Sequence, residues 1–106
     1  MTYRVEMSDR ANEDLDSVAG YVLPRAPLLG AAWMVRLEDA IAALAEFPEA
    51  HPLAPESPSV RGEVIRHLLY GTKPHIYCIL FRVDDSKQTV FVLTIRRGSR
   101  LPATGL

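Results

Sequence analysis

The sequence has few of the residues that support disulfides, membrane insertion or secretion. Its single cysteine, Cys78, excludes an intramolecular disulfide and an all-cysteine metal site. No apolar run approaches the roughly 18 residues of a membrane span, and no basic segment precedes an apolar stretch. We therefore expect no contact with a membrane and a location in the reducing cytoplasm. With 106 residues, 48% of them hydrophobic and 24% charged, residues 1–106 are expected to form one globular domain.

Residues for common catalytic and metal chemistry are also scarce. His51, His67 and His75 share no metal-ligand spacing, and the glycines stand singly rather than in a phosphate-binding loop. Cys78 falls in the middle of an apolar run, where a buried thiol is expected more often than a nucleophile. We expect neither a metal nor another cofactor.

The near-neutral net charge of −1 conceals two oppositely charged halves. Residues 1–60 contain four basic and ten acidic residues, a net charge of −6. Residues 61–106 contain eight basic and three acidic residues, a net charge of +5. Such a chain can present a basic face to an acidic partner, or its halves can attract each other within the fold.

The N-terminal half predicts a strand followed by a helical hairpin. Residues 2–7 alternate between apolar and polar side chains, as a half-buried strand does. Ser8 is a suitable N-cap for an amphipathic helix, which should end near Leu23 because Pro24 lacks the helical N–H donor. A second amphipathic helix is predicted over residues 27–47. The short link between the two helices requires them to lie antiparallel.

The C-terminal half predicts three strands. Residues 48–58 contain four prolines, so we expect an ordered, extended surface loop there. Strands are predicted at about 63–70, 75–83 and 88–96, separated by turn-forming residues. The order β-α-α-β-β-β predicts an α+β fold, in which an antiparallel sheet carries the N-terminal helical hairpin on one face.

Both faces of the predicted central strands are apolar, whereas one hairpin can cover only one of them. The second face should therefore meet a partner chain, a second subunit or the C-terminal tail. The alternative is that the chain's own proline-rich loop covers it.

Basic side chains gather on or beside the three C-terminal strands, together with Tyr70 and Tyr77. Such a surface can bind phosphates and stack bases, or it can pair with the carboxylates of an acidic segment. For any one of these basic residues, the simpler interpretation is a solvated side chain at the end of a strand. The candidates are Arg66, His67, Lys73, His75, Arg82, Arg96, Arg97 and Arg100.

Five segments resemble the RelE/ParE superfamily of toxins from bacterial type II toxin–antitoxin modules. They span nearly the whole chain in the family's order of elements. The segments are Ala11–Leu15, Ala31–Leu37, Ala43–Pro48, Tyr77–Val83 and Val90–Gly98.

The resemblance implies a cytoplasmic toxin that a cognate antitoxin holds inactive by wrapping its C-terminal segment over the toxin. It also implies one of two targets. RelE-like members cut mRNA on the ribosome with basic sheet residues and a C-terminal tyrosine, whereas ParE-like members inhibit DNA gyrase and need no hydrolytic residues.

Two departures favour the ParE-like branch. Cys78 stands where RelE-like nucleases carry an arginine, and no tyrosine follows Tyr77. Loss of such an electrostatic group raises a reaction barrier by about 2.7–4 kcal/mol, and the sequence pI of about 6.3 does not favour binding to RNA. We therefore expect a gyrase inhibitor whose active surface joins the region from Arg96 to Arg100 with the helical hairpin.

Three questions stay open at the level of sequence. The chain could instead be a ribosome-dependent endonuclease, or a toxin-fold binding module without inhibitory activity. It could form a homodimer or a toxin–antitoxin hetero-oligomer. The endonuclease would use Arg66, His67, Arg82 and Arg97, while target or antitoxin binding would use Arg66, Lys73, His75, Arg82, Arg96, Arg97 and Arg100.

Overall fold

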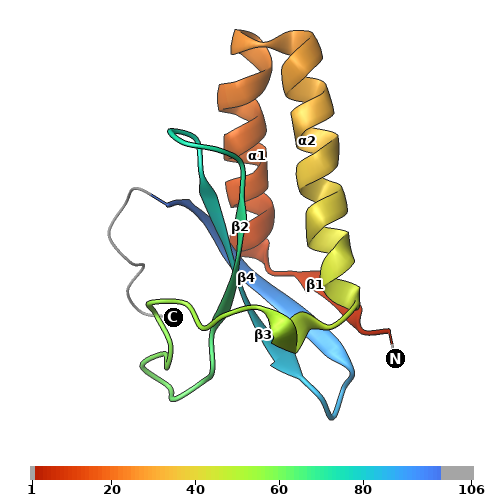
Figure 1. The fold of residues 1–106 in the computed structure, drawn as a ribbon, viewed down its shortest axis with the longest axis vertical. Helices are drawn as coiled ribbons and strands as arrows, with labels where there is room; N and C mark the ends of the chain where they lie inside the picture. Colours follow the sequence, from red (N-terminus) through yellow and green to blue (C-terminus); the bar gives the residue numbers. More distant parts are fainter. Residues whose placement is uncertain (1, 99–106) are drawn as a thin grey trace.

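The computed structural model describes residues 2–98 of the chain (Figure 1). A helical hairpin follows the first strand, and three further strands complete the chain. The elements are β1 (Arg4–Met7), α1 (Asp9–Arg25), α2 (Pro27–Ala42), the short 3₁₀ helices η1 (Ala43–Ala45) and η2 (Pro48–Ala50), β2 (Arg66–Tyr70), β3 (Tyr77–Asp84) and β4 (Thr89–Arg97).

The N-cap of α1 lies where the sequence predicts it. Ser8 Oγ accepts a hydrogen bond from the Ala11 N–H at 3.0 Å and donates one to the Leu93 carbonyl oxygen at 2.8 Å. The predicted end of this helix near Leu23 is wrong, because α1 continues through Pro24 to Arg25. A proline this close to a helix end removes only one hydrogen bond, and the Ala26 N–H still closes the last turn on the Val22 carbonyl.

The second helix is shorter than predicted. α2 ends at Ala42 rather than near Phe47, and its last turn tightens into η1. Phe47 then adopts the left-handed conformation, with φ 49° and ψ 49°, so that the chain reverses into η2 with Pro48 buried. That conformation costs an L-residue with a Cβ about 1–2 kcal/mol.

The sheet is mixed, in the order β1-β4-β3-β2. The α+β class and the β-α-α-β-β-β order are confirmed, and the predicted antiparallel pairing holds for β2, β3 and β4. β1 instead pairs parallel with β4, as in the register Val5↔Val90. Because the whole helical hairpin and two strands separate β1 from β4, no tight turn forces these strands to run in opposite directions.

The strand limits differ slightly from the predicted ones. β3 and β4 lie within two residues of their predicted bounds. β2 begins at Arg66 rather than at 63, because the preceding residues belong to the loop. The Ile65 carbonyl oxygen, for example, accepts a hydrogen bond from the Ala54 N–H at 2.9 Å. Leu53 then forms an isolated antiparallel bridge with Arg66.

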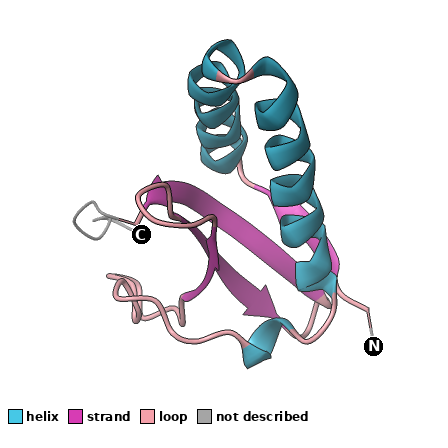
Figure 2. Ribbon diagram, turned by 45° about the horizontal axis from the view of Figure 1, so that its top comes forward, coloured by secondary structure: helices cyan, strands magenta, loops and turns pink. Residues whose placement is uncertain are grey.

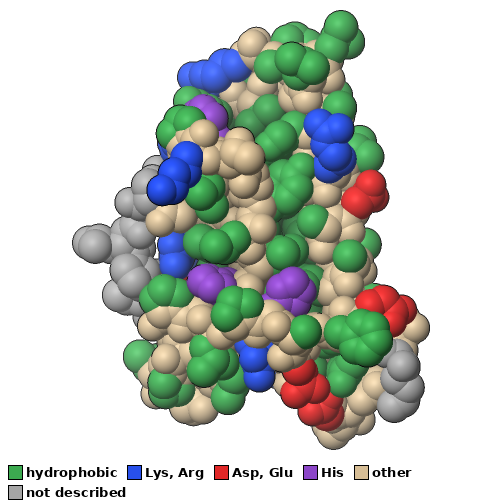
Figure 3. All heavy atoms as spheres, in the orientation of Figure 1, with side chains coloured by type: hydrophobic (Ala, Val, Ile, Leu, Met, Phe, Trp, Pro, Cys, Tyr) green, Lys and Arg blue, Asp and Glu red, His purple; other side chains and the backbone are tan. Residues whose placement is uncertain are grey.

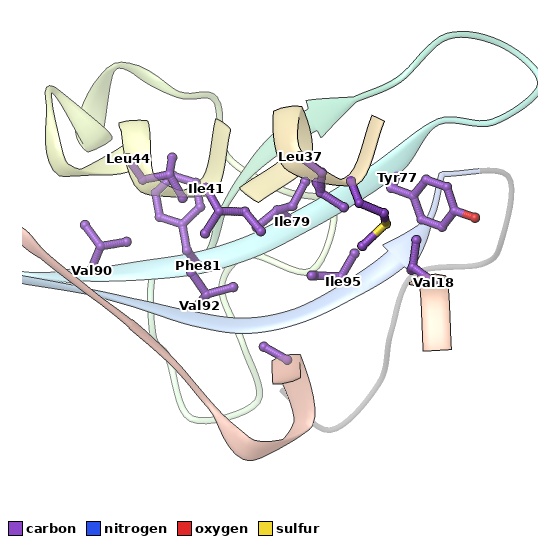
Figure 4. Packing of buried hydrophobic residues seen from close by; sticks show 12 residues of the cluster. Val18, Leu37, Ile41, Leu44, Tyr77, Ile79, Phe81, Val90, Val92 and Ile95 are labelled. Carbon is purple, nitrogen blue, oxygen red and sulfur yellow. The ribbon is translucent and has the colours of Figure 1, made fainter. Parts of the chain in front are cut away.

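The face of the sheet under the hairpin, here called the helical face, holds the main core. Figure 2 shows the hairpin standing on this side of the sheet, and Figure 4 shows Leu37 and Ile41 of α2 pointing toward Ile79 of β3. Leu37, Ile79, Phe81, Val90 and Val92 are fully buried there. This continuous apolar layer explains the amphipathic pattern of both helices.

The opposite face, here called the loop face, carries a second and smaller core. Residues 48–65, here called the covering loop, cross the lower part of the sheet (Figure 1). Ala54 and Ile65 of this loop pack on Cys78 and Leu80 of β3. The chain's own proline-rich loop therefore covers the middle of this face, which was the alternative that the sequence left open. Leu69 of β2 stays 55% exposed beside it.

One carboxylate joins α1 to the far end of β4. β1 pairs with β4 only from Thr89 to Val92. Beyond that point, Asp14 Oδ2 accepts hydrogen bonds from the Thr94 hydroxyl and from the Ile95 N–H, the latter at 3.0 Å.

Candidate functional site

A buried ion pair fastens the covering loop to the sheet. Arg96 Nε on β4 lies 2.6 Å from Glu56 Oε2, and the two side chains are only 12% and 2% exposed. The hydrogen bond to Glu56 holds the pKa of Arg96 above its usual range. Arg96 is thus committed to a contact within the chain.

Two further arginines of the sheet are also engaged by the covering loop: Arg82 on the loop face, and Arg66, which pairs with Phe81 on the helical face. Arg66 Nη1 donates to the His51 carbonyl oxygen at 2.7 Å. Arg82 Nε lies 3.1 Å from Glu63 Oε2, and its guanidinium stacks 4.2 Å from the centre of the Phe91 ring. The Arg96–Glu56 pair joins the basic half of the chain to the acidic half, as one reading of the charge pattern predicted, whereas Arg82 and Glu63 both belong to residues 61–106.

A cleft of about 530 Å³ remains above the covering loop, between the tip of β2 and the end of β4. His67, Lys73, Cys78 and Arg96 line it, together with Leu69 and Ile76. His67 Nδ1 is buried without a hydrogen-bond partner among the described residues. Burial lowers the pKa of His67 and the Arg96 charge lowers it further, so the ring is neutral at pH 7.

The thiol in this cleft is poorly suited to act as a nucleophile. Burial raises the pKa of Cys78, which keeps the sulfur protonated at neutral pH. The expected small buried thiol is confirmed, since Cys78 is buried in the smaller core of the loop face.

Within residues 2–98, the other predicted basic residues do not join this cleft. His75 lies on the side of the hairpin. Arg97 is half-buried at the end of β4, and its Nε has no hydrogen-bond partner among the described residues. Arg100 lies outside the described residues. The structure thus divides the predicted basic set among several locations.

A second hollow, of about 330 Å³, lies between the far end of the hairpin and the sheet; we call it the hairpin groove. Its aromatic wall is formed by Trp33, whose ring centre lies 5.6 Å from that of Tyr77 and 5.1 Å from that of Tyr70. Tyr21, Arg25 and Leu29 form the helical rim, with His75 opposite them.

Glycines shape this groove at two points. Gly30 permits the close approach of the helices, since a Cβ there would lie 2.8 Å from Val22 Cγ1. Gly71 has φ +96°, and a Cβ would collide with the His75 carbonyl oxygen. The tight turn that brings His75 to the groove therefore requires glycine at position 71.

The end of the hairpin is both apolar and weakly cationic. No acidic residue occurs between Asp16 and Glu38, where Arg25 and Arg36 are the charged residues. Leu28 and Leu29 are 87% and 79% exposed. On the face seen in Figure 3, hydrophobic and basic side chains occupy this upper end.

Sequence reasoning missed most of the groove residues. No pattern in the sequence singles out Tyr21, Arg25 or Leu29, while Trp33 follows the core stripe of its helix and does pack against the core as well as lining the groove. The available signal was the acid-free stretch from residue 17 to 37, within a half of the chain that carries a net charge of −6. Exposed apolar surface of this kind marks a binding site.

Neither hollow has the features of a metal or membrane site. Within residues 2–98, no group of three or more His, Cys, Asp or Glu side chains is placed to hold a metal ion. In the same part of the chain, no helix is long and apolar enough to cross a membrane. The geometry supports binding of an apolar, acidic protein segment in the hairpin groove more directly than it supports chemistry.

The chain matches the model of one protein family. The family described as "ParE toxin of type II toxin-antitoxin system, parDE" matches residues 5–102. No curated protein matches at a significant level.

Solved structures share the fold. The chromosomal ParDE toxin–antitoxin system from P. aeruginosa matches with a TM-score of 0.68 and 17% identity, covering 91% of this chain and 96% of that one. The intact E. coli RelBE toxin–antitoxin complex matches with a TM-score of 0.61 and 19% identity, covering 92% and 99%. The Mycobacterium tuberculosis RelBE2 complex matches with a TM-score of 0.56 and 26% identity, covering 92% and 99%.

Proposed function

The chain belongs to the ParE toxin family of type II toxin–antitoxin systems, and we propose that it inhibits DNA gyrase in the cytoplasm by protein–protein contact. A cognate antitoxin would neutralise it. The observation that carries this proposal is the engagement of three sheet arginines, Arg66, Arg82 and Arg96, by the covering loop.

That engagement favours binding over RNA cleavage. Phosphate recognition and transition-state stabilisation need guanidinium groups whose donors point at the substrate. Arg96 is instead paired with a nearly buried Glu56, and Cys78 presents a protonated thiol on the same face. A toxin that acts by covering a surface of its target needs none of these groups to be free.

The hairpin groove supports the antitoxin part of the proposal. Its aromatic wall and the exposed leucines suit large apolar anchor residues, and Arg25 and His75 at the rim suit carboxylates. The related RelBE structures are complexes with antitoxins. We place the antitoxin segment in this groove.

The endonuclease is the second candidate, and the cleft on the loop face favours it. Neutral His67 has an unpartnered ring nitrogen there, and Lys73 is exposed at the rim. Such an enzyme would use Arg66, His67, Arg82 and Arg97, but two of these arginines would first have to leave the covering loop. An inactive toxin-fold binding module is the third candidate.

Induction of the chain in a bacterial host, with and without the antitoxin encoded beside it, tests the toxin proposal. We expect growth arrest that the antitoxin reverses. Supercoiling by purified gyrase should then fall as the toxin is added, while primer extension on ribosome-bound mRNA shows no new ends. Codon-specific cuts with intact supercoiling would instead establish the endonuclease, and absence of arrest would leave the binding module.

Two variants locate the surfaces. Leu29→Asp places a charge in the hairpin groove and should weaken antitoxin binding at least tenfold in titration calorimetry. Arg97→Ala should reduce gyrase inhibition if the end of β4 touches the target. Arg10→Ala, on the exposed side of α1, is the control for loss of one positive charge. Unchanged inhibition by Arg97→Ala would remove this region from the active surface.

A further inference from the structure

Phe47 occupies a backbone position that does not suit it. Its left-handed φ and ψ are typical of glycine or asparagine, and a proline follows it, which further disfavours helical backbone angles. The chain reversal itself is structural, because the Ala50 N–H bonds to the Phe47 carbonyl oxygen at 3.0 Å and Pro48 is buried. The reversal needs the backbone conformation but not the benzyl group.

The ring of Phe47 gains nothing from packing that would compensate for this strain. The residue is 79% exposed, although the chain buries its other two phenylalanines wholly or partly. Strained residues with exposed apolar side chains occur where a partner uses the side chain.

Acidic residues flank Phe47 in the sequence, and a hydrogen-bonded tyrosine links one of them to a third carboxylate. The Tyr3 hydroxyl donates to Asp85 Oδ1 at 2.7 Å and lies 3.3 Å from Glu49 Oε1, while Glu46 Oε1 accepts from the Thr2 hydroxyl at 3.1 Å. We call Tyr3, Glu46, Phe47, Glu49 and Asp85 the acidic end. Figure 3 shows acidic and hydrophobic side chains next to each other at the lower right, opposite the hairpin end.

The basic residues near the acidic end do not neutralise it. Arg4 Nη2 pairs with Glu6 Oε1 at 3.2 Å. Lys87 interacts with Asp84, and its ammonium group lies 5.9 Å from the centre of the Phe91 ring. Glu46, Glu49 and Asp85 therefore leave the surface around Phe47 negative.

We propose that the acidic end docks onto the toxin's target, with the Phe47 ring entering an apolar pocket that Lys or Arg side chains border. This inference rests on the proposed toxin function and assigns the target a binding surface separate from that of the antitoxin. The charges separate the two partners: the hairpin groove is bordered by Arg25 and suits an acidic segment, whereas the acidic end repels such a segment.

Phe47→Asn gives a direct test, because asparagine suits the left-handed conformation and the variant should fold with a raised melting temperature. We expect the induced variant to lose growth arrest, with at least a tenfold higher concentration needed for half-inhibition of the target in vitro. Its affinity for the antitoxin, measured by calorimetry on the purified full chain, should stay within twofold of the wild type.

Matched variants separate the contributions of the aromatic ring, of the acidic charge and of exposed apolar side chains in general. Phe47→Trp keeps an aromatic ring and should retain arrest, whereas Glu49→Lys should weaken it. Val60→Asn in the covering loop removes a side chain of equal exposure, 81%, and should have no effect on arrest.

Each other outcome overturns the proposal. Full arrest by Phe47→Asn would show that the target does not use the ring. A parallel loss of antitoxin binding would assign the acidic end to the antitoxin. A wild-type dimer that the variant abolishes in light scattering would assign it to a second copy. Absence of arrest by the wild type would refute the toxin function, and this inference with it.

Discussion

The two faces of the sheet are covered in different ways. On the helical face, α1 and α2 bury a continuous layer of aliphatic and aromatic side chains against β3 and β4. On the loop face, the covering loop packs Ala54 and Ile65 on two apolar residues of β3 and is held there by contacts with Arg82 and Arg96, while Arg66 holds it from the helical face. The first cover rests on apolar area, whereas the second rests on a few directional contacts between oppositely charged or polar groups.

This difference predicts that substitutions on the two faces have different effects on stability. A packed helical layer loses stability whenever one large side chain is removed, since neighbours relax only in part. A loop held by single contacts can be released by one substitution while the main core stays folded. The arginines that contact the covering loop therefore serve to attach this loop to the sheet, and they do not form a phosphate-binding site.

The largest expected effect lies on the helical face. Leu37→Ala removes a fully buried side chain of α2 and should lower the free energy of unfolding by about 3–4 kcal/mol. Denaturant unfolding followed by circular dichroism measures this change. A loss below about 1 kcal/mol would mean that the hairpin contributes little to the core.

The next effect concerns the loop face. Glu56→Gln leaves Arg96 half-buried without its charged partner, and should cost about 2 kcal/mol, less than a fully buried pair because the arginine keeps some contact with water. The single thiol, Cys78, should then react faster with a thiol reagent as the covering loop opens. Replacing both partners by methionine should restore stability, since no unpaired charge remains. Unchanged labelling of Cys78 in Glu56→Gln would show that the pair does not hold the loop.

A smaller effect is expected at the exposed pair of the same face. Glu63→Gln breaks the contact with Arg82. Because both side chains are about one-third exposed, the free energy of unfolding should fall by no more than about 0.5 kcal/mol. This loss should shrink further in high salt. Equal losses of unfolding free energy in Glu63→Gln and Glu56→Gln would contradict the inference that the buried ion pair stabilises the loop more than the exposed pair does.

The smallest effect is a pH dependence at the acidic end, outside both faces. The hydrogen bond to Asp85 raises the pKa of Tyr3 to about 12, so the folded state holds this proton more tightly than the unfolded state, whose pKa is about 10. Its contribution to stability is complete below pH 10 and is lost as the pH rises toward 12. Thermal unfolding of Tyr3→Phe should lack this alkaline component, and an identical pH profile in the wild type would contradict the assignment.

The sequence predicted those features that local patterns determine. The Ser8 cap, the two amphipathic helices and the three C-terminal strands follow from periodicity and turn residues, and the quoted segments identified the superfamily. The parallel pairing of β1 with β4 was not predicted, because alternation shows which residues share a face but not which strand lies alongside.

Contacts distant in sequence account for most of what was missed at the site. Glu56 and Arg96 lie forty positions apart, and no spacing rule joins them. The hairpin groove combines residues of α1, α2 and β3, such as Tyr21, Trp33 and Tyr77, and no helical or strand pattern brings these together. Phe47 was read as the end of a helix, because a left-handed backbone at a phenylalanine has no pattern in the sequence.

The Asp14 carboxylate has a consequence for how this sheet meets other chains. β4 extends past β1, and its Ile95 N–H would otherwise offer a strand from another molecule a place to pair. By accepting that hydrogen bond from α1, Asp14 closes part of an exposed strand edge without adding another strand. The side chain thereby occupies a backbone donor through which a strand of another molecule could otherwise extend this sheet.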